Sequence, residues 1–572
     1  MRISIAKKKL GSYIYIVKDV TINGKRTTKP IDSLGSIRSL SKKLNISEDK
    51  VIPWARELAK EMTIKENEQN NTISIKFSQS KLINKNCLNT YNSGYLFLQS
   101  VYHELGLNNI CKSISDKYKI EYDLNSILSR LIYTRILYPG SKRTSYDSSK
   151  KLIEQPDFDI HQIYRSLDVI AKENSFIQSQ VYKNSTKAFK RNTSVLYYDC
   201  TNYFFEIEKA SGLKQYGMSK EHRPNPIVQM GLFMDGDGLP LAFCINPGNQ
   251  NEQLSLKPLE EDIIKDFKLS KFIVCTDAGL ASKSNRIFNN KSNRSYIVTQ
   301  SLKKIKKYLQ EWSLETSGWK LRGNGKEYNI SDIDESLSYN SIFYKERWIN
   351  ENEIEQRLIV SYSLKYKNYQ QSIRQGQIER AEKMVKKQNN KKAKRPNDPS
   401  RFIEEYHTTE NGEIADENSL SMNESAILKE AKFDGFYAVC TTLEDDIEDI
   451  INVNKRRWEI EESFRIMKTE FKSRPVYLSD DERIKAHFTT CYLALLIERI
   501  IEKKLEEKYT TSNIINTLRD MNLHILPGEG YTPGYERTDL TDKLHEIFKF
   551  RTDYQITTNK NIKKIIKKSK NK

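Results

Sequence analysis

The sequence predicts an α/β protein in which a mixed sheet carries the residues with catalytic chemistry. Between residues 194 and 299, stretches rich in β-branched and aromatic residues alternate with stretches of helical periodicity, in the order β-β-β-α-β-α-β. One acidic residue lies inside the first of these strands, and another lies directly after the fourth. A later strand, Phe436 to Thr441, precedes a long predicted helix, from about 445 to 472, that carries a third candidate carboxylate.

The charge balance of the chain narrows the choice of partner. The 572 residues include 94 Lys and Arg against 75 Asp and Glu, which gives a formal net charge of +19. A surplus of this size favours a polyanionic partner, and nucleic acid is the commonest one. A protein whose charge serves only solubility, with a basic tail, is the alternative interpretation.

The composition also excludes several classes of protein. The mean hydropathy is −0.69. The longest apolar run near the C-terminus, Cys491 to Ile497, is far shorter than the roughly 20 residues of a membrane-spanning helix. The seven cysteines are scattered without a C-x-x-C pair, which argues against a zinc module or a disulfide framework and favours the reducing cytosol.

Two regions precede the predicted sheet. In residues 1–85, apolar and polar residues alternate around Asn23-Gly24, which predicts a small β-containing unit with a hairpin. Residues 86–190 show helical periodicity, broken at Pro139-Gly140. The basic turn after this break contains Lys142 and Arg143 and is suited to phosphate binding, although an ordinary solvated loop explains it equally well.

The elements of the predicted core follow in order. The first strand, Ser194 to Glu208, contains Asp199, and a carboxylate inside an apolar strand is costly unless it is paired or bound to a metal. The fourth strand, Phe272 to Thr276, ends directly before Asp277. The remaining elements are a pair of strands joined by a turn, a helix, a second helix and a fifth strand: Ile227 to Met234, Leu239 to Ile245, Glu252 to Phe267, Ser282 to Asn290 and Ser295 to Thr299.

The last part of the chain contains an interruption and a tail. Residues 300–434 lose the pattern and are predicted to be an insertion subdomain, with a charge-rich loop at 386–400. The region 511–572 ends in a segment with seven lysines, 559–572, which predicts a flexible basic tail. The predicted catalytic core therefore consists of two segments, 191–299 and 435–510.

The predicted helix around Trp458 has two faces. At about 100° per residue, the core face is formed by Ile460, Phe464, Met467 and Phe471. The stripe beside it is formed by Arg457, Glu461, Arg465 and Lys468. A carboxylate flanked by cations at the rim of the core can bind a metal while its neighbours hold phosphates. A face of intrahelical salt bridges is the alternative interpretation.

Three carboxylates therefore stand out: Asp199, Asp277 and Glu461. Each has a structural explanation of its own, but a chance occurrence of all three in this order of elements is much rarer. Together they would form an oxygen-only site, which suits Mg²⁺ or Mn²⁺. Two such ions about 3.5–4 Å apart can activate a nucleophile and stabilise the leaving oxygen in phosphoryl transfer.

These features resemble the DDE transposases of bacterial insertion sequences, in particular the insertion sequence four and sixteen-thirty-four type with the signature Y-x2-R-x3-E-x6-K. Within RRWEIEESFRIMK, Arg457, Glu461 and Lys468 occupy the last three signature places, whereas Asn454 stands at the tyrosine place. Other segments similar to this family occur in the same order: LYPGSK, IYRSLDVIA, YYDCTNYFFE, YGMSKEHRPNPIVQMGL, GNQNE, VCTDAGLASKSN and ERIKAHFTTCYLALL. The similarity covers most of residues 90–500.

The resemblance implies a ribonuclease-H-like core, split by the insertion, and a DNA-binding role for the helical region 86–190. Asp199, Asp277 and Glu461 would be the catalytic residues and would bind two Mg²⁺ ions, with Mn²⁺ as a substitute. The residues expected to contact DNA are Arg457, Lys468, Asn454, Arg465, Lys142 and Arg143. In relatives an aromatic side chain of the insertion can stack on a flipped base, and the candidates here are Trp312, Trp319 and Trp348, for each of which a core position is the alternative.

The expected function is metal-dependent cleavage and strand transfer of the ends of the protein's own insertion sequence. The expected partners are double-stranded DNA, as terminal inverted repeats and as target, and a second copy of the chain on paired ends. No membrane is expected, and the expected location is the bacterial cytoplasm, on the nucleoid. Two alternatives remain open: a ribonuclease-H-like nuclease that cuts without joining, and a non-catalytic DNA-binding protein derived from a transposase.

Overall fold

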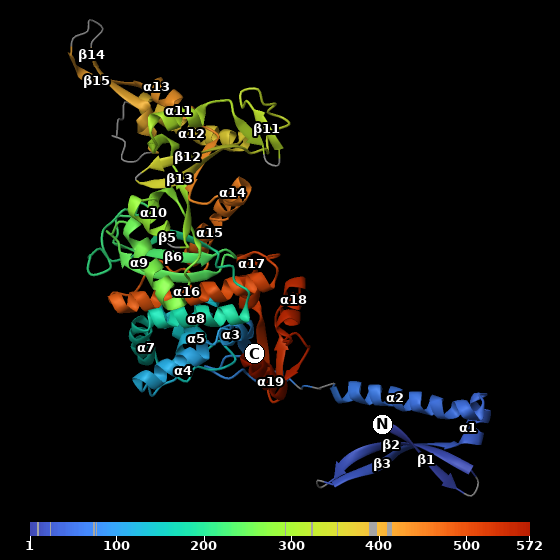
Figure 1. Ribbon diagram of the computed structural model, residues 1–572. Helices are drawn as coiled ribbons and strands as arrows, with labels where there is room; N and C mark the ends of the chain where they lie inside the picture. Colours follow the sequence, from blue (N-terminus) through green and yellow to red (C-terminus); the bar gives the residue numbers. More distant parts are fainter. Residues whose placement is uncertain are drawn as a thin grey trace. The chain divides into compact units, whose positions relative to one another are not determined.

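The computed structural model of the protein describes residues 1–8, 11–22, 25–71, 75, 77–291, 293–321, 324–351, 353–387, 397–408 and 414–571. The chain divides into two compact units, Met1–Cys87 and Leu88–Lys572. The division lies close to residue 85, where the sequence predicts the end of the small β-containing unit. Figure 1 shows the elements of each unit.

The first unit is a three-stranded antiparallel sheet with two helices on one face (Figure 1). Its elements are β1 (Arg2–Lys8), β2 (Gly11–Ile22), β3 (Lys25–Ser36), α1 (Ile37–Leu44) and α2 (Glu48–Asn71). Ile14 packs against Leu40, Val51 and Ala55 in a core of its own. β2 and β3 pair as far as their ends at residues 22 and 25, as a hairpin requires; the predicted Asn23-Gly24 turn lies outside the described residues.

The second unit is built on a ten-stranded mixed sheet of order β11-β10-β12-β13-β16-β9-β8-β5-β6-β7. β5 pairs antiparallel with β6 and parallel with β8, and β8 pairs parallel with β9. The predicted order β-β-β-α-β-α-β is confirmed by β5 (Val195–Phe204), β6 (Ile227–Asp235), β7 (Pro240–Pro247), α9 (Gln253–Asp262), β8 (Ile273–Thr276), α10 (Lys283–Asn289) and β9 (Ser295–Gln300). A π-helical turn, Ile263–Phe267, extends α9, and a short 3-10 helix, Ala278–Leu280, follows β8.

β5 is covered on both faces, which explains its nearly continuous apolar sequence. Tyr197 and Tyr203 point into the largest hydrophobic core of the molecule, while Leu196 and Tyr198 point into a second core on the opposite face. Asp199 interrupts this run and is the one residue of β5 that is not fully buried.

The predicted insertion adds strands to the same sheet. β13 pairs with β16 (Phe436–Thr441), and β16 pairs with β9, so the sheet runs without a break from the core into the insertion. The other elements of the insertion are a 3-10 turn (Leu302–Lys304), α11 (Lys307–Leu314), β10 (Trp319–Leu321), β11 (Asn324–Tyr328), β12 (Phe343–Glu351), β13 (Ile354–Tyr362), α12 (Leu364–Lys386), a 3-10 turn (Pro399–Phe402), β14 (Ile403–Thr408), β15 (Ile414–Met422) and α13 (Glu424–Ala431). Most of the predicted loop at 386–400 lies outside the described residues.

The helices of region 86–190 pack around a late helix rather than forming a separate body. α16 (Asp481–Lys504) lies between the sheet and these helices (Figure 1) and contacts α3, α5 and α7. The apolar run Cys491 to Ile497 is fully buried in this core. The helices are α3 (Tyr95–Glu104), α4 (Leu107–Tyr118), α5 (Leu124–Leu137), α6 (Lys142–Ser149), α7 (Ile160–Lys172) and α8 (Asn174–Ala188). Within the described residues, no helix has both the length and the apolar character that a bilayer crossing needs.

The prediction of a flexible basic tail is wrong. Residues 559–570 form α19 (Asn559–Lys570), which packs against α3, and Gln99 donates a hydrogen bond to Ser569 at 3.1 Å. The helix forms because Ile562, Ile565 and Ile566 share one face, which covers the large core while the lysines remain outside. The other C-terminal elements are α17 (Thr511–Asp520), β17 (Asn522–Leu526), β18 (Gly530–Pro533), α18 (Asp539–Phe548) and β19 (Thr557–Thr558), and β17 pairs with β4 (Thr90–Asn92).

The long helix predicted from about 445 to 472 is two helices. α14 (Ile447–Lys455) ends at a turn, and α15 (Trp458–Thr469) begins after it. The turn contains Arg456 and Arg457, and the backbone N–H of Arg457 donates to the carbonyl oxygen of Asn454 at 3.3 Å. The break therefore contains the signature arginine and directly precedes the helix that carries Glu461.

Candidate active site

Asp199 and Asp277 lie side by side at one edge of the sheet. In the parallel pair β5–β8, Tyr198 is in register with Thr276, so the next residue on each strand is a carboxylate. Asp277 directly follows β8 and caps the 3-10 helix after it, accepting a hydrogen bond from the Leu280 N–H at 3.1 Å. The predicted positions of both residues, one inside the first strand and one after the fourth, are confirmed.

The surroundings of Asp199 disfavour the ionised form of its carboxyl group. Burial raises the pKa of Asp199 to about 6; the Lys220 ammonium opposes this shift, and the neighbouring Asp277 carboxylate adds to it. Arg457 also lowers the pKa of Asp199, which places the guanidinium within electrostatic reach of this carboxylate. The ionised form of Asp199 therefore gains from any cation that binds at this edge.

Lys220 is a residue of this site that the sequence analysis did not single out. Its ammonium donates to the carbonyl oxygen of Cys200, next to Asp199, and lies 3.3 Å from a carboxylate oxygen of Glu252. Its backbone N–H donates to Asn202 on the same strand at 3.2 Å. Lys220 thus supplies a positive charge beside the paired carboxylates. The available signal was its position in the segment YGMSKEHRPNPIVQMGL, which resembles the transposases.

Lys468 reaches the same edge from α15. Its ammonium donates to the Thr201 hydroxyl at 2.7 Å and lies 3.5 Å from a carboxylate oxygen of Glu221. Burial lowers the pKa of Lys468 to about 8, and the Lys220 cation adds to this shift while Asp199 opposes it. Two ammonium groups are therefore held on the Asp199 side of the sheet.

Glu461 is held differently from the two aspartates. It lies on the first turn of α15, its side chain is 58% exposed, and it forms an ion pair with Arg457 at 3.3 Å. Among the described residues, the one group of three potential metal ligands whose atoms lie within 4.8 Å of one another is Asp542, His545 and Asp553, not the predicted triad. In that other group Arg551 donates to both aspartates, so a cation already balances them.

The donor set at the sheet edge is compatible with a divalent ion. Asp199 and Asp277 offer carboxylate oxygens, the donors that Mg²⁺ and Mn²⁺ prefer. Burial raises the pKa of Asp199 despite Lys220 and Arg457 nearby, so a bound cation would favour its ionised form. Glu461 is exposed, and its ion-pair partner among the described residues is Arg457.

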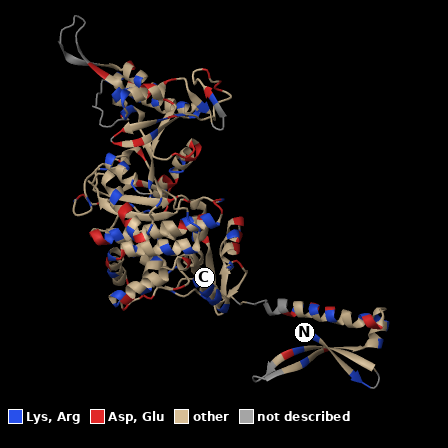
Figure 2. Cartoon of the chain, in the orientation of Figure 1, with Lys and Arg blue, Asp and Glu red and all other residues tan. Residues whose placement is uncertain are grey.

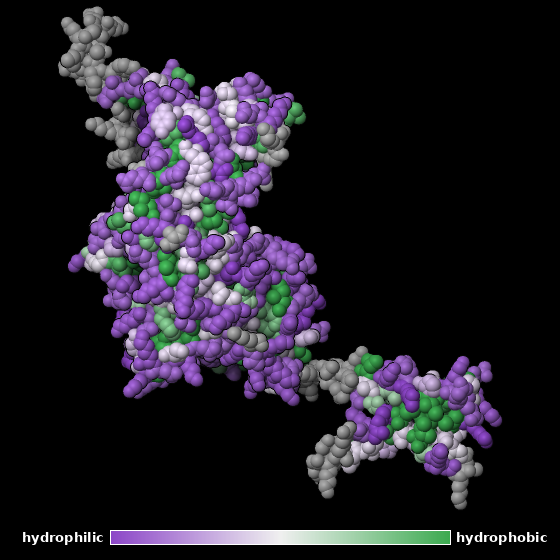
Figure 3. Space-filling model, viewed as in Figure 1, coloured by the Kyte–Doolittle hydropathy of each residue, from purple (hydrophilic) through white to green (hydrophobic). Residues whose placement is uncertain are grey.

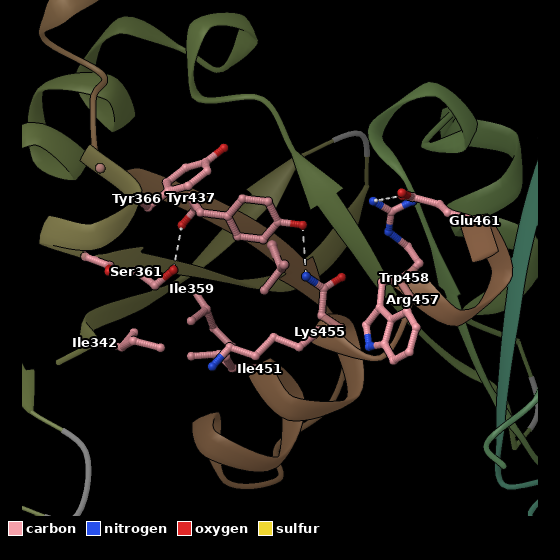
Figure 4. A pocket seen from close by; sticks show the side chains of 14 residues that line it. Ile342, Ile359, Ser361, Tyr366, Tyr437, Ile451, Lys455, Arg457, Trp458 and Glu461 are labelled. Atoms are coloured by element: carbon pink, nitrogen blue, oxygen red, sulfur yellow. Dashed lines mark hydrogen bonds and ion pairs between the residues drawn. The ribbon is translucent and has the colours of Figure 1, made fainter. Parts of the chain in front are cut away.

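An apolar cavity of about 330 Å³ adjoins Arg457 and Glu461 (Figure 4). Tyr366 and Tyr437 form part of its wall, with ring planes at 84° to each other, and Trp458 lies next to Arg457 (Figure 4). β13, β16, α14 and α15 line most of it, so the insertion and the core build it together. Trp458 is 56% exposed, which is unusual for so large an apolar side chain.

Asn454, at the tyrosine place of the signature, lines this cavity and is bound to a tyrosine. Its amide donates to the Tyr437 hydroxyl at 2.9 Å, and Tyr437 also hydrogen-bonds to Thr299 at 2.8 Å. The cavity therefore has an aromatic hydroxyl next to Asn454, supplied by β16 instead of by α14.

The other predicted DNA-binding residues are dispersed. Arg465 is bound to Glu462 at 2.8 Å, so it turns away from the Arg457–Glu461 pair. Arg143 is exposed on α6. Lys142 is only 4% exposed, and burial, with Arg135 beside it, lowers its pKa to about 7. The prediction that Lys142 contacts DNA is wrong for this structure, because the ammonium is enclosed near Arg135 of α5 and Cys491 of α16.

The three candidate stacking residues occupy different environments. Trp319 is fully buried in the core of the insertion, and Trp312 packs beside it. Trp348 is 46% exposed on β12 but does not line the cavity at Glu461. Trp319 is therefore a core residue, as the alternative interpretation of the sequence has it. The exposed aromatic side chain next to the candidate site is that of Trp458.

Comparison with known proteins gives one family. A model described as a transposase DDE domain matches residues 204–497, just over half of the chain. The matched segment includes Asp277 and Glu461 and begins shortly after Asp199. No curated protein sequence matches the chain.

Several solved structures match the chain, and one of them is aligned over much of its length. It is a piggyBac transposase synaptic complex with hairpin DNA, with 8% sequence identity and a TM-score of 0.35 over 87% of this chain and 83% of that chain. The family model, which matches more than half of the chain, shows that the chain belongs to the family of proteins with a transposase DDE domain.

Proposed function

We propose that the protein is a DNA transposase that cleaves the ends of its own insertion sequence and joins them to target DNA, with a ribonuclease-H-like core as its catalytic domain. The observation that carries the proposal is the pair Asp199 and Asp277 on adjacent parallel strands of a chain with a transposase DDE domain. The signature residues Arg457, Glu461 and Lys468 on and next to α15 support it.

The residues have distinct tasks in the proposed reaction. Asp199, Asp277 and Glu461 would hold divalent ions, which supply Lewis-acid activation of the nucleophile and stabilise the leaving oxygen. Arg457 and Lys468 would hold the non-bridging oxygens of the scissile phosphate, since both cations lie near Asp199. Glu461 would exchange its ion pair with Arg457 for the metal, which frees the guanidinium for the phosphate.

The chemistry takes place in two steps. In the first, a water oxygen attacks phosphorus, the bond to the 3′ oxygen of the element breaks, and that oxygen leaves as a hydroxyl. In the second, this 3′-hydroxyl attacks a target phosphodiester and displaces the 3′ oxygen of the target strand. No covalent protein–DNA intermediate is required. Because two ends must be held together, a dimer on paired ends is part of the proposal.

The cavity beside Arg457 is suited to a nucleobase that has left the helix. Its aromatic residues, Tyr366, Tyr437 and Trp458, can stack on a base, and the Asn454 amide and the Tyr437 hydroxyl can hydrogen-bond to it. This position replaces the expected stacking on the tryptophans of the insertion. We expect Trp458→Ala to reduce cleavage of duplex ends more than cleavage of ends with an unpaired base at that position.

A cleavage assay with Mg²⁺ tests the function. Asp277→Ala should remove nicking of DNA that carries the element's ends, while binding to the same DNA is retained. Cleavage at the wild-type rate by Asp277→Ala would contradict the assignment. An assay with pre-cleaved ends and a supercoiled target separates a transposase, which gives joined products, from a nuclease that cuts without joining. Absence of both activities in the wild-type protein would favour the non-catalytic DNA-binding alternative.

A further inference from the structure

The net positive charge of the protein is concentrated in the first unit. Residues 1–87 contain 18 Lys and Arg against 8 Asp and Glu, a net charge of +10, whereas the second unit has a net charge of +9. The smaller unit thus carries more than half of the surplus with less than a sixth of the residues. Figure 2 shows these cations on both the strands and the helices of the unit.

Among the described residues of the first unit, α1 and α2 cover one face of the three-stranded sheet. Ile14 and Ile16 point toward α1 and α2 and are fully buried. Because side chains alternate along a strand, Tyr13 and Tyr15 point to the opposite face, where both are half-buried. We call this second surface the sheet face and define it by Arg2, Lys8, Tyr13, Tyr15 and Thr28.

The sheet face is polar, positively charged and aromatic. The Lys8 ammonium lies over both tyrosine rings, at 5.0 Å and 5.5 Å from their centroids, and donates to the Tyr15 hydroxyl at 2.8 Å. The Arg2 guanidinium contacts Thr28 and pairs with Asp19 at 3.3 Å, with 61% of the arginine side chain exposed. Apolar residues of the unit lie instead between α2 and the sheet, as the hydropathy view indicates (Figure 3).

The strands have the length and arrangement that a DNA groove accepts. β1 pairs with residues 11–17 of β2, whereas β2 and β3 remain paired to residues 22 and 25. Beyond β1 the sheet is therefore a two-stranded antiparallel ribbon, which carries Thr28 of the sheet face, while Arg2, Lys8 and the two tyrosines lie on the adjoining three-stranded part. A two-stranded ribbon fits the major groove of B-DNA, which is about 12 Å wide, and several DNA-binding proteins use strands in this way.

We propose that the first unit is a DNA-binding module that lays its sheet face into the major groove of duplex DNA. The ribbon enters the groove with Thr28 toward the base edges, and Arg2 and Lys8 on the adjoining three-stranded part contact phosphates at the groove edges. The choice of DNA among polyanions rests on the proposed function. The helical region 86–190, expected from the sequence to bind the element's ends, would share this task with the first unit.

Salt-dependent binding of the full-length protein to a fluorescein-labelled DNA duplex of mixed sequence tests the proposal. Each phosphate contact contributes about 0.9 to the slope of log K against log salt. The variant Arg2→Gln/Lys8→Gln should therefore lower the slope by about two units. The single variant Lys8→Gln, which removes only contacts on the surface, should lower it by about one unit and guards against misfolding of the double variant.

The matched control removes two cations from the opposite side of the unit. Lys42 and Lys43 are exposed on α1, and Lys42→Gln/Lys43→Gln changes the net charge by the same amount. This control should leave the slope within about half a unit of the wild type. An equal or larger loss in the control, or an unchanged slope in both sheet-face variants, would overturn the proposal.

A second arm tests the groove and separates this inference from the proposed function. Duplex RNA has a major groove too narrow for a sheet, so Lys8→Gln should not change its binding; an equal loss on RNA and DNA would contradict groove insertion. The readout is binding alone. If the wild-type protein fails to cleave DNA but sheet-face variants still weaken DNA binding, the proposed function fails and this inference stands. If the wild-type protein cleaves DNA but the sheet-face variants leave the salt slope unchanged, the proposed function stands and this inference fails.

Discussion

The two halves of the candidate active site are held in place by different means. Asp199 and Asp277 are fixed by the register of β5 and β8, and their side chains lie against a buried sheet. Arg457 and Glu461 lie at the start of α15, where Glu461 is exposed and its described partner is Arg457 itself. The fold itself therefore positions Asp199 and Asp277, which we call the aspartate edge. The arrangement of Arg457 and Glu461, which we call the glutamate edge, depends on what binds there. We expect metal and DNA to complete the site by drawing Glu461 away from Arg457.

The largest effect should be the loss of cleavage in Asp199→Asn and in Glu461→Gln. Both changes keep the size of the side chain and remove a charged oxygen ligand. Each should lower the cleavage rate by more than about 100-fold, because loss of a residue that merely supports a metal ligand already costs about 10–100-fold. Nicking of DNA with the element's ends in Mg²⁺ measures this. If Glu461→Gln retained full activity, the glutamate edge would not belong to the site.

The free energy of unfolding of the metal-free protein should respond differently to substitutions at the aspartate edge and at the glutamate edge. Because the pKa of Asp199 is raised from 3.8 to about 6 in the folded protein, stability falls as the pH rises through that range and stays low above it. At about pH 8, Asp199→Asn should stabilise the metal-free protein by on the order of 2–3 kcal/mol. Glu461→Gln should have almost no effect, since its side chain is exposed. Thermal unfolding in a chelator at about pH 5 and about pH 8 gives both values.

A fall in stability for Asp199→Asn at the higher pH would mean that Lys220 and Arg457 already balance the aspartate. The candidate edge would then be a structural ion-pair network rather than a site that needs a cation. The control is the same pair of variants below about pH 3, where Asp199 is protonated in both the folded and the unfolded state and the asparagine should change little.

The sequence predicts the aspartate half of the site well and the rest less well. A buried parallel strand is an apolar run, so one carboxylate within it and another directly after the fourth strand are visible without coordinates. The break before α15 is not visible, because the apolar periodicity of the two helices continues across Arg456 and Arg457. Tyr437 lies on a strand beyond the insertion, and only the folded sheet brings it to Asn454.

Two of the incorrect predictions have different causes. Lys142 follows Pro139-Gly140, where a basic turn is usually exposed, and only the packing of the distant α16 encloses it. The C-terminal helix could have been predicted, because Ile562, Ile565 and Ile566 repeat at helical spacing beneath the lysines. The burial of Lys142 depends on tertiary packing, which no local sequence pattern reports. The prediction of a flexible C-terminal tail gave too much weight to the charge of the segment.

A substitution at Lys220 tests whether the aspartate edge binds a divalent cation. Its ammonium supports Asp199 electrostatically in the metal-free protein, so it should compete with a divalent ion. Lys220→Gln should bind Mn²⁺ at least about tenfold more tightly, because a neighbouring unit charge contributes on the order of 1–4 kcal/mol. Electron paramagnetic resonance of free Mn²⁺ measures the affinity. A weaker affinity in Lys220→Gln would show that the lysine positions the ligands instead.

The smallest expected effect is a difference in DNA binding between variants of two arginines, Arg457 and Arg465. Arg457 pairs with Glu461 and acts on Asp199, whereas Arg465 is bound to Glu462 on the neighbouring part of α15. Arg457→Gln should lower the salt slope of binding to the element's ends by about one unit, while Arg465→Gln should leave it unchanged. Since each variant removes one cation from the same helix region, the difference between them reports position and not total charge. Equal losses would mean that α15 attracts DNA only through its overall charge, and an unchanged slope for Arg457→Gln would leave the arginine a role in the fold alone.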